Sequence, residues 1–372
     1  MIYFDNAATT FPKPKSVIRA VNECLNKYCG NPGRSSHSLS LRASEEIYEA
    51  REKIAEFLGA DRAERVVFTY NATHALNLAI KTVITEKCHV ITSDVEHNSV
   101  IRPLEKLRRT LGIEYSCFDT DKELSGELER IVREDTKCIV STVASNVTGK
   151  NTDIKALSDF SRKKNIPLIL DASQALGHEP FDLNLTPCTV LCAPGHKSLF
   201  GIQGSGIAVF SDDTLRDSFI EGGSGSESIK VEMPARLPER YEAGTPSVPS
   251  IIALKAGIDF INKVGIDSIK EKTDQIRLEI IDRLSSLDRI SFITGAGAII
   301  SFGIRDVPSS KISEMLDDVG ICTRSGLHCS PSAHKKLGSL DYGTVRISLS
   351  CFNTKKEADM LYKAMKDILP RV

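Results

Sequence analysis

Short apolar runs alternate with amphipathic stretches through the first two thirds of the chain. Runs of about four to seven apolar residues bounded by polar or turn residues are typical of strands buried on both faces. The stretches between them repeat their apolar positions with the helical period. Strands that alternate with helices predict a mostly parallel sheet covered by helices on both faces. The predicted strands are residues 66–70, 89–93, 137–143, 166–170, 189–193 and 206–210.

The pattern changes after residue 250, where a smaller α+β part is predicted. Its expected elements are two long amphipathic helices to about Leu287, strands at 298–302 and 344–348, and a last helix at 355–369. Before it, residues 222–250 are rich in Gly, Ser and Pro, which favours a functional loop over a flexible linker. We predict a large domain of residues 16–248 and a small domain of residues 1–15 together with 249–372.

Composition and charge narrow the classes of partner. The chain has 372 residues, 41% of them hydrophobic, which is enough to bury a large core. Its 48 Lys and Arg nearly balance its 49 Asp and Glu, so neither nucleic acid nor an anionic membrane is expected as a partner. No apolar run approaches membrane-spanning length, and the first five residues carry no leader signal, which predicts a cytoplasmic protein.

The cysteines also fit a cytoplasmic protein. In the cytoplasm the ten Cys are expected to be reduced thiols. None forms a C-x-x-C pair, and Cys188 and Cys192 lack neighbouring ligands for a zinc site. No metal is therefore expected.

Two of the predicted strands end in chemically informative residues. Strand 166–170 is followed by Asp171, and strand 189–193 leads through a turn to Lys197. Ligands of open α/β sheets lie outside the carboxyl ends of the strands, so the two side chains can face one crevice. A Lys that forms a Schiff base and an acid that protonates a ring nitrogen are what pyridoxal phosphate requires. Taken alone, the pair favours ordinary roles, a helix cap and a solvated lysine.

Further polar residues lie at other predicted strand ends. Thr73 is at a predicted helix N-terminus, which favours phosphate binding, although it also suits an N-cap. The imidazole of His97 can stack on a flat ring. Asn146 and Gln174 can donate hydrogen bonds to ring substituents or satisfy backbone groups instead. Together with Asp171 and Lys197, these residues provide the parts of one cofactor site.

Six motifs of the chain are informative together: Phe4-Asp-Asn-Ala-Ala-Thr-Thr10, Glu96-His97, Ser145-Asn146, Asp171-Ala-Ser-Gln174, Gly195-His-Lys197 and Arg324-Ser-Gly-Leu-His-Cys329. In matching order from residue 2 to the last helix, the chain resembles the cysteine desulfurase family. That family belongs to the class V aminotransferases and has the type I fold of pyridoxal phosphate enzymes. The resemblance implies a large domain with a mostly parallel seven-stranded sheet between helices and a smaller α+β domain. It covers NifS-like and SufS-like enzymes and is strongest to the SufS-like branch.

The resemblance implies pyridoxal 5'-phosphate as the cofactor and a role for each matching residue. Lys197 would hold the cofactor, Asp171 would pair with the ring nitrogen, and His97 would stack on the ring and take part in catalysis. The implied cofactor ligands are Thr73, His97, Asn146, Asp171, Gln174, His196, Lys197 and Thr245. The implied substrate ligands are Arg346, which would clamp the carboxylate, and Asn146, Ala7 and Arg324.

Thr245 resembles a phosphate ligand that family members supply from the neighbouring subunit, which implies a homodimer. Two residues depart from the family's usual pattern. Pro194 stands where many relatives have Ser, and His74 where Glu is frequent. Both departures concern the binding of the phosphate, not the chemistry.

Cys329 differs from Cys138 and Cys192, which fall in apolar strands, because it lies in a polar loop. An ordinary thiol with a pKa of about 8.5 is only about 3% thiolate at pH 7. A positive charge on nearby His328 or Arg324 would raise that fraction. With the resemblance, Cys329 is predicted to take the sulfur of L-cysteine as a persulfide while L-alanine is released.

Other functions remain open at this point. A selenocysteine lyase would use the same site, whereas a plain aminotransferase or epimerase would leave Cys329 unexplained. A sulfur-carrier or scaffold protein without catalysis would not need Lys197 and Asp171. A nucleotide-binding protein is disfavoured because no phosphate-binding glycine motif follows the first strand. A sulfur-acceptor protein is an expected partner, and iron–sulfur assembly, tRNA thiolation and selenium metabolism all fit.

Overall fold

The computed structural model describes residues 1–33, 37–211 and 217–372. Its main sheet contains the strands β2 (Val66–Thr69), β3 (His89–Ser93), β4 (Glu114–Phe118), β5 (Thr136–Thr142), β6 (Leu168–Asp171), β7 (Val190–Pro194) and β8 (Gly206–Phe210). These strands form a seven-stranded sheet in the order β2-β8-β7-β6-β5-β3-β4. Only β8 runs antiparallel to its neighbours. The predicted mostly parallel sheet is therefore confirmed.

Alternate residues of the central strands point to opposite faces of the sheet, and both faces are buried. In β6, Leu168 and Leu170 join one apolar cluster while Ile169 joins another. Burial on both sides explains why these strands have nearly continuous apolar sequences. The edge strand β4 is different, because Glu114 and Cys117 are exposed. Its mixed sequence did not predict a strand.

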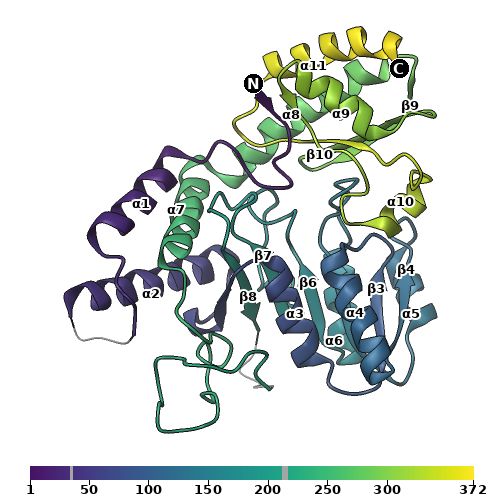
Figure 1. Cartoon of the computed structure of the whole chain (residues 1–372). Coiled ribbons are helices and arrows are strands. Elements are labelled where there is room, and N and C mark those ends of the chain that lie inside the picture. Colours follow the sequence, from purple (N-terminus) through teal and green to yellow (C-terminus); the bar gives the residue numbers. More distant parts are fainter. Residues whose placement is uncertain (34–36, 212–216) are drawn as a thin grey trace.

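Helices cover both faces of this sheet (Figure 1). They are α2 (Ser38–Leu58), α3 (Ala72–Val83), α4 (Asn98–Leu111), α5 (Leu124–Ile131), α6 (Ile154–Lys164) and α7 (Val248–Val264). The apolar residues of α3 and α4 join the cluster that contains Ile169, whereas those of α2, α5, α6 and α7 join the opposite cluster. The N-terminal helix α1 (Lys15–Lys27) packs through Val17 against Ala253 of α7.

A second, smaller unit lies beyond one end of the sheet (Figure 1). Its core is formed by a three-stranded antiparallel sheet in the order β12-β10-β9 and by helices packed on it. A two-stranded parallel pair joins β1 to β11, which attaches the N-terminus to this unit. The elements are β1 (Ile2–Tyr3), α8 (Ile266–Ser285), β9 (Ile290–Ala296), β10 (Ile299–Ile304), α9 (Ser309–Asp318), β11 (Ile321–Cys322), α10 (Pro331–Leu337), β12 (Val345–Ser348) and α11 (Lys355–Ile368).

The division of the chain at residue 248 stays a prediction. The apolar residues of α7 belong to the core under the large sheet, whereas the buried residues Ile276 and Ile280 of α8 belong to the small core. This packing favours a boundary near Gly265, between the two helices. In the described ranges no helix is long and apolar enough to cross a membrane, and no cluster of His, Cys, Asp and Glu is suited to a metal ion.

Candidate active site at the carboxyl ends of the strands

A cavity of about 160 Å³ lies at the carboxyl ends of the central strands. It is lined by residues that follow β2, β3, β5, β6 and β7 along the chain, so the sheet places the turns after separate strands around one space. The structure brings together seven of the residues predicted from the sequence: Thr73, His97, Asn146, Asp171, Gln174, His196 and Lys197.

Lys197 and Asp171 both line this cavity. Asp171 is the buried last residue of β6, and its carboxylate accepts a hydrogen bond of 3.0 Å from the backbone N–H of Ser173. Burial lowers the pKa of Lys197 to about 8, and the charge of Asp171 opposes part of that shift. At pH 7 a lysine with this pKa is neutral in about one molecule in ten, against about one in 2,500 for an ordinary lysine. Lys197 is thus prepared to act as a nucleophilic amine.

The N-terminal segment holds the backbone on either side of this lysine in place. Thr10 donates its hydroxyl to the carbonyl of Lys197 at 2.7 Å. Thr9 and Lys13 donate to the carbonyl of His196 at 3.1 and 2.8 Å. Burial lowers the pKa of Lys13 to about 8. The opening motif was matched to a family from its sequence, but its contact with the lysine turn was not predicted.

One end of the cavity presents hydrogen-bonding groups at the N-terminus of α3. The N-cap of α3 is Asn71, which accepts from the N–H of His74 at 2.9 Å, so the hydroxyl of Thr73 is not a cap. That hydroxyl lies 2.8 Å from the hydroxyl of Ser99, which lies 2.9 Å from Nδ1 of His97. Ser99, which also lines the cavity, was not predicted from the sequence.

The two histidines of the cavity are neutral. Burial, with the charges of Lys197 and Lys13, lowers the pKa of His196 to about 4, and burial lowers the pKa of His97. Nδ1 of His196 is buried and has no hydrogen-bond partner among the described residues. His74, one of the two departures from the family pattern, stacks on Tyr70 at 5.2 Å between ring centroids and does not line the cavity.

Glu96, next to His97, is a buried acid behind the cavity. Its carboxyl accepts the N–H of Thr142 at 2.8 Å and the hydroxyl of Ser93. Burial raises the pKa of Glu96 to about 8, so the acid is mostly protonated at neutral pH. It ties the end of β3 to the end of β5, beside the charged Asp171. The sequence marked Glu96 only as part of a motif.

Arg346 lies beside the cavity rather than in its lining. Its guanidinium is buried, donates to the carbonyl of Asn146 at 3.0 Å, and pairs with Asp5 at 3.0 Å. The backbone N–H of Arg346 donates to the carbonyl of Arg324 at 2.7 Å, so the two arginines lie on neighbouring segments. Ala7 is close as well, because its carbonyl accepts from Gln174 at 3.2 Å. Asp5 was not predicted as a partner of Arg346.

Cys329 is exposed, on the loop between β11 and α10. His328 and Cys329 both have left-handed backbone angles, with φ of 48° and 59°, which residues other than glycine rarely adopt. The carbonyl of Cys329 accepts from the N–H of Asn98 at 2.7 Å, and the carbonyl of His328 accepts from Asn146 at 2.7 Å. The thiol loop of the small domain is thereby bonded to residues of the cavity wall and of α4.

The expectation that His328 supplies a positive charge to Cys329 is wrong. Burial, with the charge of Arg346, lowers the pKa of His328 to about 2, so its imidazole is neutral at physiological pH. Its Nε2 lies 2.9 Å from the hydroxyl of Thr344. Arg324 remains the charged candidate of the two that the sequence proposed.

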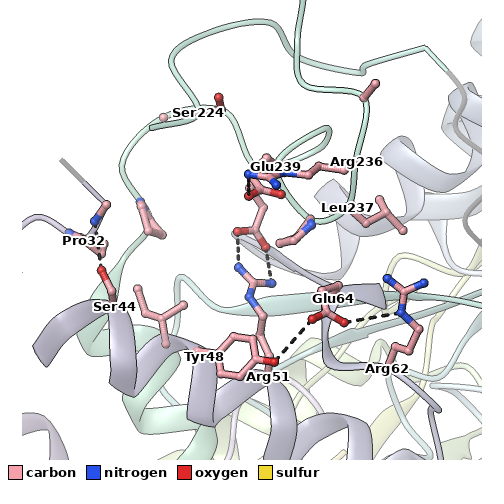
Figure 2. A pocket seen from close by; sticks show the side chains of 17 residues that line it. Pro32, Ser44, Tyr48, Arg51, Arg62, Glu64, Ser224, Arg236, Leu237 and Glu239 are labelled. Atoms are coloured by element: carbon pink, nitrogen blue, oxygen red, sulfur yellow. Dashed lines mark hydrogen bonds and ion pairs between the residues drawn. The ribbon is translucent and has the colours of Figure 1, made fainter. Parts of the chain in front are cut away.

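Thr245 does not reach the cavity. It lines a separate hollow of about 90 Å³ with Tyr70 and His74. Beside it lies a larger hollow, of about 690 Å³, between α2 and the segment 222–246. Figure 2 shows Tyr48, Arg51, Arg62 and Glu64 on one wall of this hollow, below the loop that carries Arg236 and Glu239.

Arg51 anchors the segment that leads to Thr245. Its guanidinium forms two hydrogen bonds with the carboxylate of Glu242, one of them 2.7 Å long, and lies 4.4 Å from the ring centre of Phe68. The carboxylate also accepts the N–H of Phe68. The role of Thr245 as a phosphate ligand of the neighbouring subunit stays a prediction.

The residues of the cavity fit pyridoxal 5'-phosphate. An amine and a carboxylate lie at its walls, and a neutral imidazole lies beside them. The N-terminus of α3, the hydroxyls of Thr73 and Ser99, and the unpaired Nδ1 of His196 provide hydrogen-bond donors for a phosphate. Asp171 suits the ring nitrogen, and Lys197 suits the aldehyde.

Comparison with known proteins agrees with this geometry. The family description Aminotransferase class-V matches residues 2–361. A probable cysteine desulfurase of Methanothermobacter thermautotrophicus is 32% identical over 99% of this chain and 94% of its own, and one of Borreliella burgdorferi is 30% identical over 99% and 92%. The apo structure of cysteine desulfurase from Thermococcus onnurineus superposes with a TM-score of 0.93 at 27% identity, covering 100% of this chain and 95% of that one. The chain therefore belongs to the class V aminotransferase family, in the group of its cysteine desulfurase relatives.

Proposed function

We propose that this protein is a pyridoxal phosphate-dependent cysteine desulfurase, which converts L-cysteine to L-alanine and leaves the sulfur as a persulfide on Cys329. One observation carries the proposal. Asn146, which lines the cavity of Lys197 and Asp171, is hydrogen-bonded through its side chain to the loop of Cys329. An imine-forming amine and a sulfur nucleophile are therefore linked through a single residue.

The bound cofactor would supply an electron sink for negative charge at the substrate Cα. Lys197 would hold the cofactor aldehyde at rest, and its freed amine, with a pKa of about 8, would remove the Cα proton near neutral pH. Asp171 would keep the ring nitrogen protonated, and His97 would face the ring. Thr73, Ser99 and His196 would bind the phosphate. Gln174 and Asn146 would contact the ring oxygen or the substrate.

Sulfur transfer would then take place at Cys329. Its thiolate attacks the substrate sulfur, an S–S bond forms, and the Cβ–S bond breaks. The electron pair of the broken bond returns to the substrate carbon, which takes up a proton and leaves as L-alanine. No external oxidant or reductant is needed, because the two sulfur atoms lose two electrons in forming the S–S bond and the substrate Cβ gains them as its C–S bond is replaced by C–H.

The substrate carboxylate would bind at the arginines. Arg346 is buried and already pairs with Asp5, so its guanidinium is held in place before the substrate binds. Arg324 lies on the adjacent segment, and Ala7 leaves room for the backbone to approach the substrate. A carboxylate at this place would bring the substrate sulfur to the side of the cavity that faces the Cys329 loop.

We further propose a homodimer in which Thr245 completes the phosphate site of the neighbouring subunit. Its placement in a hollow outside the cavity of its own chain supports this arrangement. The exposed Cys329 suits delivery of sulfur to an acceptor protein. We place the protein in the cytoplasm, where the ten cysteines, which form no disulfide, remain reduced.

The experiment is to incubate the purified, cofactor-loaded protein with L-cysteine and to measure alanine, sulfide and the mass of the Cys329 peptide. We expect alanine and a Cys329 peptide heavier by one sulfur atom, about 32 Da, which is lost on reduction. Protein that binds the cofactor but yields no alanine would overturn the proposal, as would a persulfide found only on other cysteines.

A further inference from the structure

Both polar atoms of the Asn146 side chain are bonded to residues that flank Cys329. Its Nδ2 donates to the carbonyl of His328 at 2.7 Å, and its Oδ1 accepts the hydroxyl of Ser330 at 2.6 Å. Ser330 is fully buried, and the bonds around Asn146 are buried as well. The amide therefore holds the loop on both sides of the thiol, while the same residue forms part of the cavity wall.

The loop needs such bonds because its backbone is in an unfavourable conformation. Two successive residues other than glycine, His328 and Cys329, are left-handed, and such residues persist only where their surroundings fix them. On the cavity side the fixing bonds are those of Asn146 and the bond from Asn98 to the carbonyl of Cys329. Ser330 supplies the only side-chain hydroxyl that these contacts use.

We propose that Ser330 is a positioning residue for sulfur transfer: through Asn146 its hydroxyl sets the place of the Cys329 thiol relative to the cavity. The inference deepens the function proposed above and rests on it. Removing the hydroxyl leaves a buried acceptor of Asn146 unpaired and releases one side of the loop. A misplacement of about 1 Å between reacting atoms can cost about 100-fold in rate.

Ser330 is a cleaner probe of this link than Asn146. Asn146 lines the cavity, so its substitution would disturb the binding of cofactor and substrate together with the loop. Ser330 does not line the cavity, and its hydroxyl is bonded to Asn146, so its substitution changes the anchoring of the loop without removing a cavity-lining residue. Two residues along, Ser332 carries a buried hydroxyl with no partner among the described residues, which makes it a matched control.

The experiment compares Ser330→Ala, Ser330→Thr and Ser332→Ala with the wild type, all loaded with cofactor. Single-turnover persulfide formation is followed by the mass of the Cys329 peptide, and substrate binding by the change of cofactor absorbance on addition of L-cysteine. We expect Ser330→Ala to slow persulfide formation about tenfold or more with substrate binding unchanged. Ser330→Thr should restore most of the rate, and Ser332→Ala should stay within about twofold of the wild type.

A second measurement does not depend on activity. In cofactor-free protein, the alkylation rate of Cys329 by iodoacetamide and the hydrogen exchange of amides 326–331 report the freedom of the loop. Both should rise in Ser330→Ala but not in Ser332→Ala. If Ser330→Ala fails to fold, Ser330→Thr and Ser330→Val provide the comparison, since they have similar size and differ in the hydroxyl.

The outcomes separate the two proposals. A wild type that makes neither alanine nor persulfide overturns the proposed function, while exchange and alkylation still test the anchoring of the loop. An active wild type with unchanged transfer, exchange and alkylation in Ser330→Ala overturns the positioning role. Equal losses of substrate binding and sulfur transfer also overturn it, because a positioning residue for the thiol acts after binding.

Discussion

The lysine cavity and the cysteine loop are built in opposite ways. Lys197 lines the cavity and is partly buried, and the carbonyls of His196 and Lys197 accept bonds from three residues of the N-terminal segment. Cys329 is exposed on a left-handed loop whose place depends on a few bonds from Asn98 and Asn146. A dry surrounding lowers the pKa of an amine, whereas a thiol that passes sulfur onward must remain accessible. Burial thus favours the neutral amine of Lys197, whereas exposure keeps the thiol of Cys329 accessible.

Replacement of Lys197 has the largest expected effect. Lys197→Ala removes the amine that would hold the cofactor and move the Cα proton, so both cofactor colour and alanine formation should be lost. Visible absorbance of the purified protein and alanine release from L-cysteine measure the two losses. Lys15→Ala, at an exposed lysine near the same N-terminal segment, is the control and should retain cofactor colour. Wild-type turnover in Lys197→Ala would contradict the assignment.

Replacement of Cys329 should separate the two regions. Cys329→Ala leaves the cavity intact, so the cofactor colour should be kept while sulfur transfer from L-cysteine falls by at least about 100-fold, as expected for loss of a nucleophile. The exposed Cys29 offers a control thiol, and Cys29→Ala should behave like the wild type. Turnover of L-selenocysteine by Cys329→Ala tests the selenocysteine lyase alternative, since selenium release depends less on a thiol.

Arg51 does not line the lysine cavity and tests how strongly the rest of the large domain depends on one buried ion pair. Arg51→Met leaves the carboxylate of Glu242 without its guanidinium, and loss of one partner of a buried pair costs about 3–5 kcal/mol of unfolding free energy. Denaturant unfolding measures the loss. Arg62→Met, at a half-exposed arginine of the same hollow, should change stability by about 0.5 kcal/mol or less. Equal effects at both positions would contradict the special role of Arg51.

The parts of the site that follow strands could be predicted from the sequence, because each strand ends in a polar residue. Asp171 directly follows an apolar run, and Lys197 follows the next one after a short turn. Once the sheet is mostly parallel, their meeting at one edge follows from geometry alone. The family resemblance then assigned a chemical role to each position.

The contacts between domains could not be predicted in this way. Arg346 pairs with Asp5 across 341 positions, and Ser330 bonds to Asn146 across 184. Both contacts depend on how the small domain docks on the large one, which leaves no periodic pattern in either segment. The neutral state of His328 was missed for the same reason, because its burial comes from packing that the loop sequence does not reveal.

The two regions should also respond to pH in opposite directions. Burial raises the pKa of Glu96 to about 8 from an ordinary 4.5, so its contribution to stability is full below pH 4.5 and is lost as the pH rises toward 8. Burial lowers the pKa of His328 to about 2 from an ordinary 6.5, so its contribution is full above pH 6.5 and is lost as the pH falls toward 2. Each group changes the slope of the unfolding free energy against pH by up to about 1.4 kcal/mol per pH unit.

Glu96→Gln isolates the contribution of the cavity side. Gln cannot ionise, so the variant should gain stability relative to the wild type as the pH rises from 4.5 to 8. Below pH 4.5 the unfolding free energies of the two proteins should change with pH in the same way. Denaturant unfolding at several pH values measures the difference. A constant difference across this range would show that Glu96 is not a buried acid with a raised pKa.

The smallest expected effect concerns the outer face of the cysteine loop. Lys336, on α10, pairs with Asp94 at 2.7 Å, Asp119 at 2.6 Å and Asp121 at 2.8 Å, and so ties the helix that follows Cys329 to the large domain. These pairs are partly exposed, so Lys336→Met should cost about 1 kcal/mol or less and slow persulfide formation by about threefold or less at low salt. At 1 M salt the difference from the wild type should disappear, because the screening length falls to about 3 Å. Lys335→Met, at a neighbour for which the described residues provide no ion pair, is the control.

One result would contradict this ranking. If Lys336→Met slowed sulfur transfer as much as Ser330→Ala at every salt concentration, the thiol would be positioned by the whole docked helix. The buried amide of Asn146 would then no longer be its principal anchor.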